Sequence, residues 1–450
     1  MKKIDVNEQA LNTEEYSELN RNYASKPQNV ILRHALSKID IPTTVNDSKN
    51  RVELETNFSL EIKTLPVANQ KVSGRCWIFA GLNVLREIIA KKCNLDKFEL
   101  SQNYVALFDK LEKSNFLLTS IIDLIESKPD DRVLMHLLVN GVGDGGQWDM
   151  FRDLVVKYGI VPQSAYEETF QSSNTKFSDQ LLNSYIREFA YEAQKLTYEG
   201  KDKKEIDILK EEVLTKMYAL LINSFGVPPT KFDFEYTDKD GKYHVEPGYT
   251  PISFFEKYIG SSIDEYVSII NSPTKDKPYM KSYTIDYLGN VIEGKPVTHL
   301  NLPMERIKEL IINQLKDGNI VWFGSDVGAY GDKVNGVWDD LSFDYMSAFG
   351  FDLKFDKAAM LDYHESAMNH AMCITGVNLR NNVPSKWKIE NSWGDAYGNK
   401  GYFIMSPSWF DTFVYQAVIL KKYLTEEELN AYKEKPVVLD PWDPMGTLAD

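Results

Sequence analysis

The spacing of apolar residues predicts a polar arm followed by a buried helix. Residues 1–60 are mostly polar, with helical spacing in residues 28–39 and an alternating, extended run near residues 51–60. Residues 76–92 are instead rich in helix formers and apolar on most faces, and they end in two lysines, the charge that suits a helix C-terminus. We therefore expect Cys76 in the first turn of a buried helix.

Helical spacing recurs over the first three quarters of the chain. It predicts helices at residues 104–125, 133–139, 147–158 and 304–316, and one or two long, charged surface helices between residues 178 and 221. A glycine-rich turn, residues 141–146, precedes the helix at 147–158, and Gly159 and Pro162 end that helix. Short strand-like pieces rich in aromatic residues occupy residues 232–282. The charged helices and these short pieces indicate an insertion into a larger fold.

The last third of the chain changes to a period of two. The alternating runs are residues 319–323, 371–377, 387–391, 401–405 and 414–420. This alternation predicts an antiparallel sheet or barrel. Residues 433–450 contain prolines and no periodic pattern, which predicts an extended tail. The expected fold class is therefore α+β.

Length, charge and cysteine content narrow the class of protein. At roughly 100 to 200 residues per domain, 450 residues suggest two to four units. A net charge of -15 repels polyanions, so we expect no nucleic acid and no anionic membrane as partner. Three cysteines without a C-x-x-C pair fit a reducing compartment, and the first residues lack the apolar run of an export signal. Because the longest apolar stretch also falls short of the ~20 residues of a membrane span, we expect a cytoplasmic protein.

Cys76 is the candidate nucleophile. A thiol attacks as a thiolate, and its acidity rises at a helix N-terminus and beside an imidazolium. A cysteine on an apolar helix is usually a buried core residue, which is our interpretation of Cys93 and Cys373. Cys76 differs because Gln70 lies six positions before it and Trp77 follows it directly. Such a glutamine can donate to an oxyanion alongside the backbone N–H of the nucleophile.

A candidate base and its orienting group lie far along the chain. His370 opens a predicted strand, and Asn391 is followed directly by serine, tryptophan and glycine. A histidine held by a third polar group is the general arrangement that activates a nucleophile, here with an amide in place of a carboxylate. The sequence therefore predicts a Cys76, His370 and Asn391 site.

These residues resemble a known family. Gln70-x5-Cys76-Trp77, His370-Ala371-Met372 and Asn391-Ser392-Trp393-Gly394 together look like the papain-like cysteine peptidases. A narrower resemblance, to the bleomycin hydrolase and aminopeptidase C branch (peptidase family C1B), is carried by residues 145–150, 158–162, 368–372 and 442–446. The matches run from about Gln70 to the C-terminus and so cover most of the chain.

Two features depart from the secreted papain pattern. Ser73 stands where that pattern has a first cysteine, which fits a cytoplasmic enzyme without the corresponding disulfide. His370 also follows Cys76 at about twice the usual separation of ~130 to 150 residues. A large insertion between the two halves of the site would explain the longer separation.

The resemblance implies a cysteine aminopeptidase that hydrolyses peptides with broad specificity. Cys76 would be the nucleophile, His370 its base and Asn391 the group that orients the base. Gln70 would complete the oxyanion site. The supporting residues would be Trp77 beside the nucleophile and Trp393 over the His370–Asn391 contact.

The resemblance also assigns the substrate-binding residues. The backbone of Gly145 and Gly146 would bind the peptide as an added strand. The C-terminal tail would lie in the cleft and present its terminal carboxylate, at Ala449 or Asp450, to the free amine of the substrate. The tail would thereby limit an endopeptidase groove to exopeptidase action.

A papain-like fold and a homohexamer are further implications of the resemblance. The implied segments are an N-terminal arm (1–60), a helical half with the nucleophile (61–165), a helical and hook-like insertion (166–300), a β-barrel half with the histidine and asparagine (301–432) and a tail in the cleft (433–450). The homohexamer would be a ring whose active sites face an inner cavity.

Three alternatives differ from an aminopeptidase. A papain-like endopeptidase would keep the nucleophile without the closed cleft, and a catalytically inactive relative would serve as a scaffold, although the intact Cys76, His370, Asn391 and Gln70 argue against it. A metalloenzyme is disfavoured because His364 and His370 lack the helical H-E-x-x-H spacing. We therefore expect no metal and no cofactor.

Overall fold

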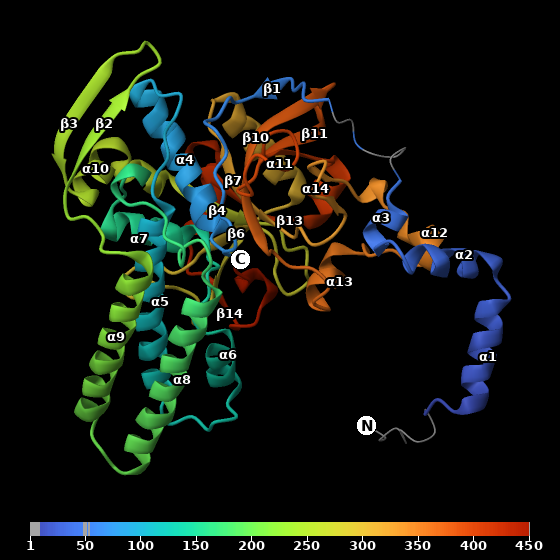
Figure 1. Ribbon diagram of the computed structural model, residues 1–450, viewed down its shortest axis with the longest axis horizontal. Helices are drawn as coiled ribbons and strands as arrows, with labels where there is room; N and C mark the ends of the chain where they lie inside the picture. Colours follow the sequence, from blue (N-terminus) through green and yellow to red (C-terminus); the bar gives the residue numbers. More distant parts are fainter. Residues whose placement is uncertain (1–9, 48–51, 53–54, 450) are drawn as a thin grey trace. The chain divides into compact units, whose positions relative to one another are not determined.

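The computed structural model describes residues 10–47, 52 and 55–449 (Figure 1). The chain forms two compact units, one of residues 1–51 with 340–353 and one of residues 52–339 with 354–450. Residues 51, 53 and 54 of the alternating run predicted near residues 51–60 lie outside the described residues. Residues 55–58 form no regular element, and the short strand β1 (Leu60–Glu61) begins at the end of the run.

The smaller unit consists of short helices. They are α1 (Thr13–Ala24), α2 (Pro27–Leu36), α3 (Ile41–Val45) and α12 (Tyr345–Phe349). A backbone bridge between Asn46 and Phe343 joins its two chain segments. The prediction of a helix in residues 28–39 is confirmed by α2. Helix α1 was not predicted, because most of its residues are polar.

Helices dominate the first half of the larger unit. They are α4 (Cys76–Cys93), α5 (Gln102–Asp123), α6 (Arg132–Asn140), α7 (Trp148–Tyr158), α8 (Lys176–Tyr198), α9 (Lys203–Phe225) and α10 (Pro251–Tyr258). The long helices α8 and α9 pack along α5 (Figure 1). The predicted helices at residues 76–92, 104–125, 133–139, 147–158 and 178–221 are confirmed. Among the described residues, no helix combines the length and the apolar character needed to cross a membrane.

A large, mostly antiparallel sheet forms the other half of this unit. Its strands are β1, β4 (Tyr266–Ile270), β5 (Lys281–Ile285), β6 (His299–Asn301), β7 (Val321–Ser325), β8 (Gly331–Asp332), β9 (Val337–Trp338), β10 (His370–Arg380), β11 (Val383–Glu390), β12 (Tyr402–Met405), β13 (Val414–Leu420) and β14 (Val437–Leu439). Their order is β14-β5-β6-β4-β13-β7-β10-β11-β12-β9-β8, with β1 on β10. All five alternating runs of the last third are confirmed as strands.

The sheet is not purely antiparallel, which differs from the sequence expectation. The pairs β4–β6, β5–β14 and β9–β12 run parallel. Each of these pairs joins strands separated by intervening elements, as parallel pairing requires. A separate hairpin, β2 (Phe232–Thr237) with β3 (Tyr243–Tyr249), lies within the predicted insertion. The remaining helices are α11 (Met304–Lys316), α13 (Lys357–Asp362), α14 (Pro407–Phe413) and α15 (Glu426–Lys433).

The contact between α4 and β10 brings the two halves of the larger unit together. Helix α4 packs against β10 near the middle of the sheet (Figure 1). Ala371 and Cys373 of β10 are fully buried, and the Cys373 thiol donates to the Ala80 carbonyl of α4 at 3.4 Å. The first residue of α4 and the first residue of β10 are therefore neighbours in space although they are far apart in the sequence.

Candidate active site

Cys76 opens α4 and is fully buried. The chain reaches it through residues 70–75, here termed the nucleophile loop, which end at the N-cap residue Arg75. The backbone N–H of Ala371 points to the Cys76 Sγ, with 3.4 Å between nitrogen and sulfur. Because a helix N-terminus favours negative charge, this position favours the thiolate form of a cysteine.

His370 and Asn391 meet through the pairing of two strands. His370 is the first residue of β10, and Asn391 directly follows the last residue of β11. The His370 Nε2 lies 2.9 Å from the Asn391 Oδ1. An N–H at Nε2 donates to this oxygen, which leaves Nδ1 as the ring nitrogen that can accept a proton. The Trp393 ring lies 4.9 Å from the His370 ring, measured between centroids, and so covers the imidazole.

Burial keeps His370 neutral. The pKa of His370 is lowered to about 4, chiefly by its burial, with the Asn391 hydrogen bond raising the pKa and the charge of Lys333 lowering it. Lys333 lies over the Trp393 ring, 4.7 Å from its centroid. At pH 7 the imidazole is therefore uncharged, which is the state a general base needs before it takes a proton.

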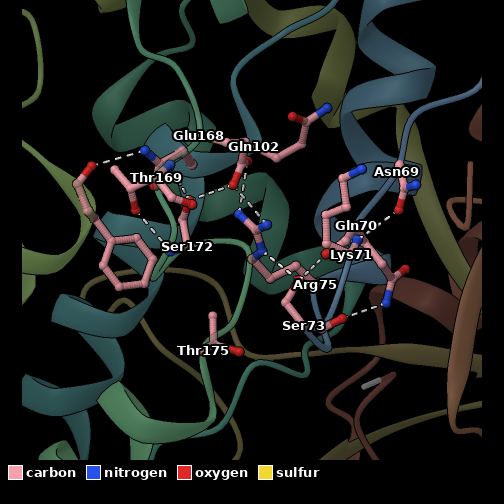
Figure 2. A network of polar contacts seen from close by, with 12 residues as sticks. Asn69, Gln70, Lys71, Ser73, Arg75, Gln102, Glu168, Thr169, Ser172 and Thr175 are labelled. Carbon is pink, nitrogen blue, oxygen red and sulfur yellow. Dashed lines mark hydrogen bonds and ion pairs between the residues drawn. The ribbon is translucent and has the colours of Figure 1, made fainter.

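Gln70 joins the nucleophile loop to the segment after β11. Its backbone N–H donates to the Ser392 carbonyl at 2.8 Å, and its side-chain Oε1 accepts from the Ser392 hydroxyl at 2.5 Å. The side-chain Nε2 donates to the Ser73 carbonyl at 2.6 Å, within the loop that Figure 2 shows. These bonds join the Gln70 side chain to Ser392, which directly follows Asn391, and to Ser73 of the nucleophile loop. One of the two N–H bonds of Nε2 remains for a further acceptor.

Arg75 anchors the other end of the nucleophile loop. Figure 2 shows its guanidinium directed at Glu168, to which it donates twice, with both distances 3.0 Å. Its Nε also donates to the Ser73 hydroxyl at 2.9 Å. The Arg75 side chain is 1% exposed and the Glu168 side chain 23%. The residue before the candidate nucleophile is therefore held by a bidentate, largely buried ion pair.

The glycine segment, residues 143–146, lies against Trp77. A Cβ at Gly146 would come within 2.4 Å of the Trp77 ring, so only glycine fits there. The Trp77 indole N–H donates to the Asp144 carbonyl at 2.6 Å. Lys113 of α5 donates to the Gly145 carbonyl at 2.6 Å. Trp77 and Lys113 thus fix the course of the glycine segment.

The C-terminal tail pairs with the glycine segment. The Gly146 N–H donates to the Ala449 carbonyl at 3.2 Å, and the Ala449 N–H donates back to the Gly146 carbonyl at 3.3 Å. The Gln147 side chain donates to the Thr447 carbonyl at 2.6 Å, and Ala449 is fully buried. Asp450 lies outside the described residues.

The base of the tail is firmly anchored. Strand β14 pairs with β5, and Lys277 forms an ion pair with Asp443 at 2.8 Å. The Arg132 guanidinium lies over the Trp442 ring, 3.6 Å from its centroid. The last described residues therefore extend from a fixed base rather than from a free end.

A cavity of about 710 Å³ adjoins the tail and the glycine segment. Its lining residues include Gly145, Met368, Asn369, Trp442 and Leu448. Met368 and Asn369 directly precede His370, so the cavity opens beside the candidate base. Its volume falls in the range of pockets that bind small ligands.

The structure brings together most of the residues that the sequence singled out. His370 contacts Asn391 and Trp393, Gln70 bonds to Ser392, and the Cys76 Sγ accepts the N–H of Ala371, the residue after His370. Trp77, which follows Cys76 in α4, contacts the glycine segment, and Gly146 pairs with Ala449. Sequence spacing did not reveal Arg75 and Asp144. Their partners are scattered along the chain, and no spacing rule reveals them. Among the described residues, no group of three or more His, Cys, Asp or Glu side chains is arranged to hold a metal ion.

A buried thiol at a helix N-terminus, beside a neutral histidine that an amide holds, provides the groups required for acyl transfer through sulfur. The chain belongs to the Peptidase C1-like family, whose pattern matches residues 10–446. The predicted family is thereby confirmed.

Relatives within this family place the chain more narrowly. It is 47% identical to Aminopeptidase C of Lactobacillus delbrueckii subsp. lactis, over 95% of this chain and 96% of that protein. It is 36% identical to Bleomycin hydrolase of Mus musculus, over 99% of this chain and 100% of that protein. The crystal structure of PepW from Lactobacillus rhamnosis HN001 matches with a TM-score of 0.95 at 44% identity and covers 98% of this chain and 99% of that one. The predicted resemblance to the aminopeptidase C and bleomycin hydrolase branch is confirmed.

Proposed function

We propose that this protein is a cysteine aminopeptidase that removes amino-terminal residues from peptides with broad specificity. The observation that carries the proposal is the convergence of Cys76, His370 and Asn391, together with the pairing of the chain's own tail with Gly146 of the glycine segment. The aminopeptidase C relatives support the same enzyme class.

The reaction runs through a thioester on Cys76. His370 accepts the thiol proton at Nδ1, and the thiolate attacks the carbonyl carbon of the first residue of the peptide. His370 then gives that proton to the departing amine as the peptide bond breaks. A water molecule, deprotonated by His370, hydrolyses the thioester and releases the amino acid. Asn391 holds the imidazole in the required tautomer during both steps.

Gln70 and the backbone N–H of Cys76 stabilise the oxyanion that forms at the attacked carbonyl. Ser392 and Ser73 hold the Gln70 amide in place, so the donor needs no reorientation when charge develops. Trp393 shields the His370–Asn391 contact from water.

The tail restricts the cleft to peptides with a free amino end. We infer a papain-like fold, with the cleft between the helical half and a barrel-like sheet half and with segment bounds 1–60, 61–165, 166–300, 301–432 and 433–450. Peptide backbone binds along Gly145 and Gly146, where Ala449 already pairs. The terminal carboxylate, at Ala449 or Asp450, meets the substrate's free amine.

The proposal is tested on one peptide supplied with either a free or an acetylated amino terminus, under reducing conditions. We expect wild type to cleave only the free peptide and Cys76→Ala to cleave neither. Cleavage of both forms by wild type would support an endopeptidase instead. No cleavage of either form would support an inactive scaffold.

A shortened tail tests the closed cleft separately. Deletion of the last four residues leaves the anchor at Asp443 intact and removes the pairing partner of Gly146. We expect slower aminopeptidase action and new internal cleavage. Full exopeptidase activity without any endopeptidase activity would contradict the role of the tail.

We also propose a cytoplasmic homohexamer. The three cysteines form no disulfide, which fits a reducing compartment. Helix α8 exposes large apolar side chains, among them Phe177, Tyr191 and Tyr198, which are suited to subunit contacts. Light scattering on the purified protein should give six times the chain mass, and a monomer would contradict the hexamer.

A further inference from the structure

Asp144 links the nucleophile loop to the glycine segment. Its carboxylate accepts the Gly74 N–H at 2.7 Å, the Lys110 ammonium at 2.6 Å and the Thr175 hydroxyl. Its backbone carbonyl accepts the Trp77 indole N–H at 2.6 Å. Asp144 is 6% exposed, so these contacts are largely shielded from water.

Asp144 belongs to the glycine segment, and its carboxylate bonds to a residue close to Cys76 in the nucleophile loop. Gly74 lies two residues before Cys76, and Gly145 directly follows Asp144. One carboxylate therefore holds the backbone beside the nucleophile, while the same residue lies two positions before Gly146, which pairs with Ala449.

The carboxyl group of Asp144 is more acidic than an ordinary aspartate. Burial raises the pKa of Asp144, but the charge of Lys110 and three hydrogen bonds outweigh it, so the net shift of the pKa is downward. Lys110 also contacts Asp179 of α8. The pKa of Asp179 is raised to about 6, chiefly by burial, with the charge of Asp144 adding to the shift. Of the two carboxylates that share Lys110, Asp144 is thus the more firmly ionised.

We propose that Asp144 is a positioning residue that sets the distance between the nucleophile loop and the glycine segment, and thereby between the Cys76 sulfur and the substrate carbonyl. This inference rests on the proposed function, because it requires peptide to bind along Gly145 and Gly146. An attacking atom misplaced by about 1 Å can cost about 10²-fold in rate. A lost tether at Asp144 is therefore expected to slow hydrolysis without removing the nucleophile.

The test compares Asp144→Asn with Asp179→Asn. Both substitutions remove a carboxylate from Lys110, but only Asp144 touches the nucleophile loop. Two rates are measured for each variant: hydrolysis of whichever peptide form wild type cleaves, and alkylation of Cys76 by iodoacetamide. Iodoacetamide is too small to need the glycine segment, so its rate reports the thiol alone. Circular dichroism and the Tm report folding.

For Asp144→Asn we expect kcat/KM to fall about 10- to 100-fold, mainly through kcat, with alkylation of Cys76 within about three-fold of wild type. Asp179→Asn should keep both rates within about three-fold of wild type. A folded Asp144→Asn with unchanged kcat/KM would overturn the proposal. A parallel loss of hydrolysis and alkylation would also overturn it, because the thiol itself would then have changed.

A milder variant covers the case in which Asp144→Asn does not fold. Asp144→Glu keeps the negative charge beside Lys110 but lengthens the side chain by one methylene, which shifts the carboxylate relative to the Gly74 N–H. A fall of kcat/KM beyond three-fold with normal alkylation would support the proposal, and unchanged kcat/KM would overturn it. Because rates are compared on whichever peptide wild type cleaves, an endopeptidase would contradict the proposed function and still decide the role of Asp144. A wild type that cleaves neither peptide would overturn both.

Discussion

The two sides of the candidate site are held in different ways. On the nucleophile side, an irregular loop is fixed by charged side chains, with Arg75 on Glu168 and Asp144 on Gly74. On the base side, His370 and Asn391 are fixed by the pairing of two strands, and the side chains that touch His370 are an amide and an indole.

The difference follows from the local backbone. Adjacent strands share a ladder of hydrogen bonds that sets the register, so side chains at their ends meet without further help. A loop has no such ladder, and its backbone groups need side-chain partners. Charged partners supply strong bonds but only where both members are present. The nucleophile side should therefore be the more sensitive to single substitutions.

The largest effect is expected from Gln70→Ala. Removal of one oxyanion donor typically costs about 10²- to 10³-fold in kcat. Loss of the Gln70 side chain also removes the bond to the Ser392 hydroxyl, while the backbone bond between the two residues remains. Steady-state kinetics on a free-amine peptide measure the loss, with the exposed Gln180→Ala as control. A fall of less than ten-fold would remove Gln70 from the oxyanion site.

A smaller loss of activity is expected from Asn391→Ala on the base side. A single hydrogen bond is worth about 1 kcal/mol net, so kcat/KM should fall about 5-fold. His370 remains fixed by β10 and covered by Trp393. The same kinetic assay measures the loss of kcat/KM. Asn378, which lies further along β10, provides the control variant Asn378→Ala. A loss larger than that of Gln70→Ala would reverse the comparison between the two sides.

Loss of the ion pair between Arg75 and Glu168 is expected to lower the free energy of unfolding. Glu168→Gln leaves a guanidinium that is 1% exposed without its charged partner. Breaking such a buried pair costs about 3 kcal/mol of unfolding free energy. Urea unfolding should show this loss, whereas Glu192→Gln, in the exposed pair with Lys195, should leave the midpoint nearly unchanged. Equal midpoints for the two variants would show that the loop does not depend on its charged anchor.

The smallest effect on kcat/KM is expected from a change of pH, which acts through protonation of His370. With the pKa of His370 lowered to about 4, the imidazole stays neutral at pH 5.5, and kcat/KM should remain within about two-fold of its value at pH 7. An imidazole with the ordinary pKa of 6.5 would lose about ten-fold. A pH profile of kcat/KM on a free-amine peptide distinguishes the two.

The lowered pKa of His370 also makes the stability of the fold depend on pH. The Tm is therefore measured at each pH of the activity profile. The folded chain binds the His370 proton less tightly than the unfolded chain does. Its contribution to stability is therefore complete above pH 6.5 and is lost as the pH falls toward 4. A drop in activity that follows the Tm would reflect unfolding rather than titration of the base.

The sequence predicted the elements and residues whose signal is local. The helix at residues 304–316 has the predicted bounds, and the motifs around Cys76, His370 and Asn391 fall where two halves of the larger unit meet. Amphipathic spacing and short motifs encode such features directly. Helix α1 was not predicted because most of its residues are polar and its apolar positions are few.

Asp144 illustrates what sequence spacing cannot provide. Its partners Gly74, Lys110 and Thr175 come from a loop, a helix and the N-cap of another helix. Only the packed fold brings these partners to one carboxylate. In the sequence, an acidic residue before two glycines is typical of an ordinary turn. The parallel strand pairs were missed for a related reason, since alternation indicates a strand but not the direction of its neighbour.

The tail that pairs with Gly146 is part of the same chain, and this has a kinetic consequence. A segment tethered near its binding site acts at an effective concentration of about millimolar, whatever the protein concentration. A peptide long enough to extend past Gly146 must compete with this tethered strand, whereas a peptide that ends at the tail does not. In the proposed binding mode, peptides of both kinds bind the same residues, and the longer kind competes with the tail at any protein concentration.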